Sequence, residues 1–145
     1  MEETTRATRE NLGYLLAKAS QRWNELLYEA FVAEGFAEVR PAYGSVILPL
    51  FEEDGLRMGE LSLRARLSKQ TMTTLVRLTE RNGLVRRERD QRDRRAARVY
   101  LTSRARSFQP VAERVLAELE GRVAGRLAPA ERTILTESLK EVMLL

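Results

Sequence analysis

Seven arginines lie within a stretch of thirteen residues in this 145-residue chain. Guanidinium groups bind phosphate through paired hydrogen bonds, so a cluster of this kind predicts contact with a polyanion. Residues 57–106 carry a net charge of +10 and the rest of the chain carries −6, so the positive charge is local. On charge alone, a solvated arginine-rich face explains the cluster equally well. The arginines are Arg86, Arg87, Arg89, Arg92, Arg94, Arg95 and Arg98.

The residue types that the chain lacks narrow its function. It contains no cysteine and no histidine, which excludes disulfides, thiol redox sensing, thiolate or imidazole metal sites and serine–histidine catalysis. No pair of carboxylates has a recognisable catalytic spacing, so we expect no enzyme, no cofactor and no metal. A charged N-terminus and the lack of a long apolar run predict a cytoplasmic protein with no membrane contact.

The arginine cluster lies on a predicted hairpin that follows two short helices. Residues 58–66 form the first helix, and residues 69–82 form the second, which begins after the capping residue Ser68. From Leu84 the apolar period changes to two, which predicts two strands with a charged, solvent-facing tip over residues 85–101. This order is that of a winged helix-turn-helix. The apolar anchors expected for the first helix are Leu61, Leu63 and Leu67.

The second helix of such a pair fits the DNA major groove and turns its N-terminal residues toward the base edges. Gln70 can read adenine through paired hydrogen bonds, and threonine offers a methyl group to the thymine methyl. Arg77, one turn further, reaches a phosphate or a guanine. An ordinary exposed helix surface is the alternative. The predicted DNA contacts on this helix are Ser68, Lys69, Gln70, Thr71, Thr73, Thr74 and Arg77.

The tip of the hairpin carries the positive charge that a narrow minor groove attracts. We therefore predict that Arg92, Arg94 and Arg95 contact DNA. Asp90 and Asp93 would repel phosphate if left free, so between arginines they are expected to form ion pairs that brace the tip. The alternative is a surface salt-bridge cluster without a function, in which each pair contributes at most ~1 kcal/mol.

Amphipathic helices flank this unit on both sides. Apolar residues recur at three- and four-residue steps over residues 5–34, for which Thr5 and Thr8 are candidate caps. Roughly thirty residues of helix span about 45 Å, more than the core of a small domain, so part of this helix is expected to pack on a second subunit. Further helices are expected over residues 41–53, over residues 103–125 and from Pro129 onward.

Four motifs follow one another at fixed distances. They are LSKQTMT at 67–73, ERNGLV at 80–85, DQRDRR at 90–95 and LT at 101–102. In this order and spacing they resemble the MarR family of bacterial transcription regulators, where they are the recognition helix, the step into the wing, the wing tip and the cap of the next helix. Any single motif is weak, but the ordered set is specific, and the resemblance covers roughly the whole chain.

The resemblance implies a mainly helical fold with a small β-hairpin, in a single domain covering residues 1–145. It also implies a homodimer in which the N- and C-terminal helices interlock. By position, the dimerisation lobe would be formed by residues 5–34 and 103–144. The winged helix-turn-helix lobe would then cover residues 41–102.

The resemblance further assigns roles to single residues. Residues 68–82 would be the recognition helix, Arg95 with Arg94 beside it would enter the minor groove, and Asp93 would brace the tip. Many members of the family bind small aromatic or phenolic effectors between the lobes, which weakens DNA binding, so a repressor relieved by such a ligand is implied. Plain core packing is the alternative for the residues of this crevice. They are Trp23, Tyr28, Phe31, Tyr43 and Ile47.

The sequence features leave three classes of function to weigh for this chain. The first is a homodimeric, sequence-specific regulator on double-stranded DNA, with a pseudo-palindromic operator whose half-sites lie about one helical turn, ~10 bp, apart. The second is a winged-helix interaction module whose basic wing meets an acidic protein partner. An enzyme is the third, and the missing catalytic groups argue against it.

Overall fold

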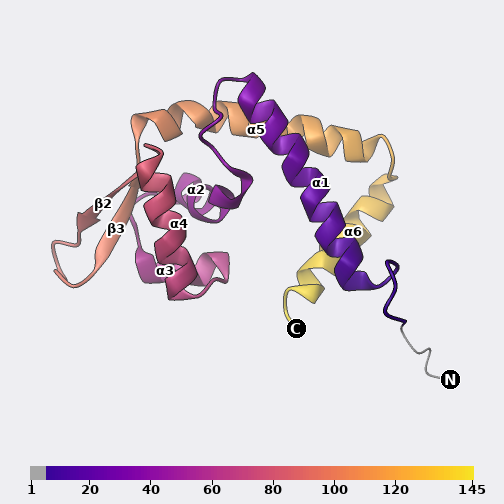
Figure 1. Ribbon diagram of the computed structural model, residues 1–145, viewed down its shortest axis with the longest axis horizontal. Coiled ribbons are helices and arrows are strands. Elements are labelled where there is room, and N and C mark those ends of the chain that lie inside the picture. The colour runs from indigo at the N-terminus through magenta and orange to yellow at the C-terminus, as the bar shows by residue number, and fades with distance from the viewer. Residues whose placement is uncertain (1–5) are drawn as a thin grey trace.

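The computed structural model describes residues 6–145, which form helices and one small antiparallel sheet. Figure 1 shows two parts, here called the winged unit (residues 44–101) and the outer helices (α1, α5 and α6). Helix α5 runs from the winged unit toward α6 and so connects them. The elements are α1 (Leu12–Ala33), the 3-10 turn η1 (Pro41–Tyr43), α2 (Gly44–Glu52), β1 (Leu56–Arg57), α3 (Met58–Ala65), α4 (Lys69–Arg81), β2 (Val85–Arg89), β3 (Ala97–Leu101), α5 (Ser103–Ala124) and α6 (Pro129–Val142).

The helix-turn-helix has the predicted form. The Ser68 side chain caps α4 by accepting a hydrogen bond from the Thr71 backbone N–H. Met72 and Val76, one turn apart, are fully buried, so this side of α4 faces the core. Gly83 follows with a φ of 76°, a left-handed conformation that glycine adopts without strain, and it turns the chain into the sheet.

The sheet has three strands in the order β1-β3-β2. The predicted hairpin is present, with Val85 opposite Leu101 and Arg89 opposite Ala97. Strand β1, which pairs Leu56 with Val99 at the other edge, was not predicted because two residues are too few to show a period of two. The predicted fold class, mainly helical with a small β-hairpin, is confirmed.

Helix α1 begins later than predicted. Its N-cap is Asn11, whose side chain accepts a hydrogen bond from the Tyr14 backbone N–H, so the predicted cap at Thr8 is wrong. Thr8 instead shapes the turn before the helix, where its side-chain oxygen accepts from the Glu10 N–H. Thr5 lies outside the described residues. With 22 residues, the helix spans about 33 Å rather than the expected 45 Å.

Two further expectations are corrected in the next helices. Residues 41–53 do not form one helix, because the 3-10 turn η1 precedes α2. Leu63 is not an apolar anchor of α3, since 81% of it is exposed, whereas Leu61 is fully buried. The two side chains lie two residues apart, which places them on opposite sides of a helix.

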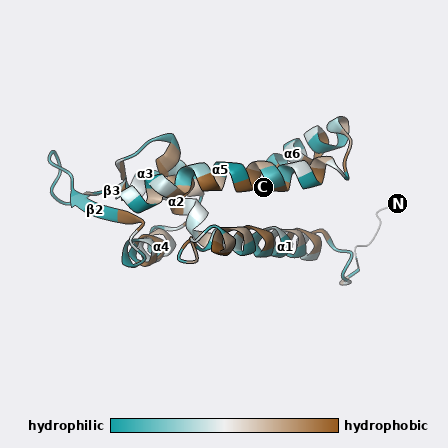
Figure 2. Cartoon of the chain, turned by 90° about the horizontal axis from the view of Figure 1, so that it is seen from above, coloured by the Kyte–Doolittle hydropathy of each residue, from teal (hydrophilic) through white to brown (hydrophobic). Residues whose placement is uncertain are grey.

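An aromatic cluster joins the outer helices to the winged unit. Seen from above, α1 lies in one row and α5 and α6 lie in another (Figure 2). The rows meet where Phe31 of α1 packs edge-on against Phe108 of α5, with 4.8 Å between ring centres. Phe36 and Phe51 pack on the same Phe108 ring. Within residues 6–145, no helix combines the length and apolar character needed to cross a membrane.

Candidate nucleic-acid interface

The first turn of α4 presents an exposed polar surface. Ser68, Lys69, Gln70 and Thr71 are all exposed, and Arg77 is exposed nearly two turns further along. The buried side of the helix faces the core, so these side chains are on the side that is free to meet a duplex. Apart from Arg77, the predicted contact residues of the helix therefore lie at its N-terminal end.

Two threonines of this surface already use their hydroxyl protons. Thr73 Oγ1 donates to the Lys69 carbonyl at 2.8 Å, and Thr74 Oγ1 donates to the Gln70 carbonyl at 3.1 Å. Such bonds to the preceding turn leave the methyl group and an acceptor lone pair for other contacts. Thr73 is half-buried and Thr74 is exposed, so Thr74 is the more accessible of the two.

The tip of the wing is shaped by its two aspartates. Asp90 Oδ1 accepts from the Arg92 N–H at 3.1 Å, and Asp93 Oδ1 accepts from the Arg95 N–H at 3.0 Å. Each carboxylate thus closes a small turn by bonding the backbone N–H two residues further on. The side chains of Arg92, Arg94 and Arg95 are exposed, so the tip presents three guanidinium groups on a braced backbone.

The ion pairs of the wing differ from those expected. Asp90 is 3% exposed, and its Oδ2 lies 2.6 Å from Arg57 Nη2 and 3.6 Å from Arg98 Nε. These arginines belong to strands β1 and β3 rather than to the tip, so the ion pairs tie the base of the wing to the edge of the sheet. The hydrogen bond from the Arg92 N–H, together with the two arginine charges, lowers the pKa of Asp90. Nothing in the local sequence around Arg57 marks it as the partner of a residue in the wing.

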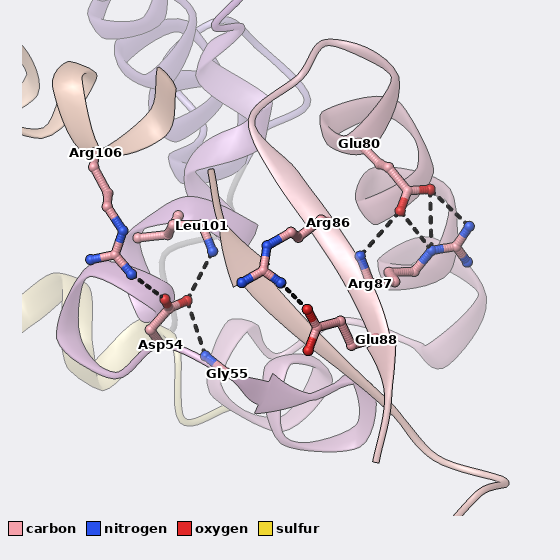
Figure 3. A network of polar contacts seen from close by, with 8 residues as sticks. All are labelled: Asp54, Gly55, Glu80, Arg86, Arg87, Glu88, Leu101 and Arg106. Atoms are coloured by element: carbon pink, nitrogen blue, oxygen red, sulfur yellow. Dashed lines mark hydrogen bonds and ion pairs between the residues drawn. The ribbon is translucent and has the colours of Figure 1, made fainter. Parts of the chain in front are cut away.

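A second ion pair joins the recognition helix to the wing. Glu80, in the last turn of α4, lies 2.9 Å from Arg87 Nη2 and also accepts from the Arg87 backbone N–H at 3.2 Å. Figure 3 shows these contacts crossing from the helix to strand β2. The Arg87 side-chain hydrogen bond lowers the pKa of Glu80, against a smaller opposing effect of burial. The helix and the strand are therefore held in one relative orientation.

Asp54 connects three segments at the other end of the sheet. Its Oδ1 accepts from the backbone N–H groups of Gly55 and Leu101 at 3.0 and 2.9 Å, and its Oδ2 lies 2.7 Å from Arg106 Nη2 (Figure 3). The turn before β1, the end of β3 and the start of α5 thus share one carboxylate. Sequence reasoning missed this role because the partners are far apart along the chain.

The five residues predicted to line an effector pocket do not form one exposed surface. Phe31, Tyr43 and Ile47 are buried in the hydrophobic core, while Trp23 and Tyr28 are half-buried. The Tyr28 hydroxyl donates to the Ala37 carbonyl at 3.0 Å. A hollow of about 320 Å³ does lie between α1 and α5, but its lining includes none of the five. The apolar residues of that hollow are Leu26, Ala30, Val115 and Leu119.

The fold defines a class, the winged helix-turn-helix proteins. Residues 50–96 match the model of the MarR family. Over 64 residues the chain is 39% identical to the HTH-type transcriptional regulator TtmR of Methylorubrum extorquens (strain PA1), and the match covers 44% of this chain and 33% of that protein. The predicted resemblance to the MarR family is therefore confirmed.

Solved structures of other proteins share this fold over most of the chain. The PcaV transcriptional regulator from Streptomyces coelicolor, in complex with its natural ligand, has a TM-score of 0.80 at 21% identity, with 97% of each chain covered. The transcriptional repressor CouR, bound to a 23-mer DNA duplex, has a TM-score of 0.79 at 24% identity, with 97% of this chain and 99% of that chain covered. At these identities the likeness shows the fold. The relatives are transcriptional regulators and not enzymes, as expected for this chain.

Proposed function

We propose that this protein is a homodimeric, sequence-specific DNA-binding regulator of transcription, and specifically a repressor. One observation carries the proposal. The exposed polar turn of α4 and the arginine tip of the wing belong to two elements, α4 and the β2–β3 hairpin, that the Glu80–Arg87 pair joins. The match to the MarR family over residues 50–96 supports the same function.

In this mechanism each part of the winged unit meets a different groove. Helix α4 enters the major groove, where Gln70 and Thr74 face the base edges. The wing tip enters the adjacent minor groove with Arg95 leading and Arg94 beside it. Asp90 keeps the base of the wing in place through its ion pairs with Arg57 and Arg98.

The outer helices support a homodimer. In the described part of the chain α6 has no buried residue, although it is amphipathic. A helix that exposes an apolar stripe to water is expected to bury it against a partner. The N-terminal half of α1 is similar, with Leu12 and Leu15 exposed. The exposed apolar residues of α6 and the C-terminus are Ile134, Leu135, Leu139, Met143, Leu144 and Leu145.

Relief by a small aromatic effector belongs to the same proposal. Tyr43 accepts a hydrogen bond at 2.9 Å from Asn82 Nδ2, and Asn82 ends the recognition helix. A ligand that displaces Tyr43 would therefore disturb α4 directly. Such a ligand should quench Trp23, the single tryptophan, and lower DNA affinity over the same concentration range. Quenching without a change in DNA affinity would argue against this coupling.

Fluorescence anisotropy on the DNA upstream of the gene tests the DNA-binding function. The wild-type protein should bind this DNA more tightly than a shuffled duplex, and its affinity should fall steeply with salt. Changing Arg94→Ala together with Arg95→Ala should weaken binding by roughly tenfold or more, without lowering the melting temperature. Equal affinity for shuffled DNA would overturn sequence specificity. Unchanged DNA binding with loss of a protein complex would favour the interaction module with an acidic partner.

A further inference from the structure

The turn between α3 and α4 contains an arginine in an unfavourable backbone conformation. Arg66 has φ 56° and ψ 41°, in the left-handed region. Residues with a Cβ atom avoid this region, whereas glycine enters it freely. Three other positions within residues 6–145 have positive φ, and all three are glycine, namely Gly35, Gly55 and Gly83.

The tight turn explains the backbone conformation but not the choice of arginine. The Arg66 N–H bonds to the Leu63 carbonyl, and the Leu67 N–H bonds to the Ser62 carbonyl at 3.1 Å, so the chain reverses at the end of α3. Glycine would make the same two backbone bonds without strain. A favourable contact of the arginine side chain would offset this cost.

Contacts within the protein do not supply that gain. Arg66 is exposed, and within residues 6–145 its guanidinium forms no hydrogen bond and no ion pair. Two neighbouring arginines differ in this respect, because Arg64 pairs with Glu53 and Arg57 pairs with Asp90. A positive charge at the C-terminal end of α3 does interact favourably with the helix dipole. This interaction is the alternative explanation for an arginine at this position, and the experiment below tests it.

The position of Arg66 suggests a ligand for the free guanidinium. Arg66 precedes Ser68, the N-cap of the recognition helix, by two residues. The exposed Lys69 and Gln70 follow in the first turn of that helix. A duplex that met these side chains would bring its backbone to the same end of α4, where positive charge and free N–H groups attract phosphate.

We infer that Arg66 contacts a DNA phosphate beside the recognition helix, and that its strained conformation is retained for this contact. The inference rests on the proposed DNA-binding function. It adds a residue outside both the recognition helix and the wing to the interface. A phosphate contact contributes affinity and register, and it does not read sequence.

The test compares four variants with the wild type by fluorescence anisotropy on the upstream DNA across a range of salt. Arg66→Gly and Arg66→Asn suit the left-handed backbone and remove the charge. Arg66→Lys keeps the charge. Arg126→Ala removes one positive charge from the turn between α5 and α6, at the end of the molecule away from the wing (Figure 1).

Arg66→Gly and Arg66→Asn should weaken binding by roughly tenfold. The slope of log affinity against log salt should fall by about 0.9 for each Arg66 in the complex. Their melting temperatures should equal or exceed that of the wild type, while Arg66→Lys and Arg126→Ala should bind nearly as the wild type does. Wild-type affinity and slope in Arg66→Gly would overturn the inference. A loss of affinity that appears only with a lower melting temperature would also overturn it, in favour of the helix-dipole role. If the wild type itself failed to bind DNA, the proposed function would fail first.

Discussion

Helices α3 and α6 show how differently the two parts of the molecule are packed. Helix α3 has eight residues, yet it buries Leu61 completely. Helix α6 has fourteen residues, and in the described chain it buries none of them. Burial of apolar surface is the main stabilising contribution to a fold, so the shorter helix is the better stabilised. The winged unit is therefore packed within one chain, whereas α6, at the end of the outer helices, leaves most of its apolar residues exposed.

The largest effect is expected from the core of the winged unit. Leu61→Ala should lower the free energy of unfolding by about 3 kcal/mol, because a fully buried leucine leaves a cavity. The loss should be seen in urea denaturation of a dilute and of a concentrated sample. Leu63→Ala is the matched control, since Leu63 lies on the exposed side of the same helix, and it should change stability by less than about 0.5 kcal/mol.

The next effect concerns the outer helices. Leu139→Glu places a charge on the apolar face of α6, where 41% of the leucine is exposed in a single chain. In a dimer this face would be covered, so the buried charge should weaken association by at least about tenfold. Sedimentation velocity over a range of protein concentrations measures the change. A variant that dimerises as the wild type does would place the partner surface elsewhere.

The smallest effect is expected from the Glu80–Arg87 pair that joins α4 to β2. Both side chains are more than a third exposed, so Glu80→Gln should lower stability by at most about 1 kcal/mol at pH 7. Because folding lowers the pKa of Glu80, this contribution is present above the ordinary glutamate pKa of about 4.3. The stabilising contribution of the pair is lost as the pH falls through the lower pKa that Glu80 has in the folded protein.

The DNA affinities of two variants separate the effect of wing orientation from the effect of removing a negative charge. Glu80→Gln should weaken binding a few-fold, because one of the contacts that fix the orientation of the wing relative to the recognition helix is weakened. Glu88→Gln removes the same charge from a pair with Arg86 that stays within strand β2, so it serves as the control. If the two variants bound DNA equally, the pair with Arg87 would have no positioning role.

Local patterns made much of the winged unit predictable. Ser68 marked the start of α4, Gly83 marked its end, and the change of period at Leu84 marked the strands. The prediction failed where two signals competed. At the start of α1, Thr8 and Asn11 are both capping residues, and only the hydrogen bond to Tyr14 shows which of them caps the helix.

Contacts between distant segments had no such local signal. Asp54 binds Leu101 across 47 residues, and Asp90 pairs with Arg57 on an edge strand too short to predict. The fold of the chain brings these distant groups together. Spacing along the sequence does not show which partner each carboxylate contacts. The strain at Arg66 was likewise invisible, since the residue type alone suggests only a charged surface.

The central claim is that two winged units, held by the outer helices of two chains, read one duplex. The stoichiometry of the complex with the upstream DNA, measured by sedimentation velocity at moderate salt, tests this most directly. The account predicts two chains per duplex on that DNA and little complex on a shuffled duplex of the same length. One chain per duplex, or the same amount of complex on both duplexes, would contradict it.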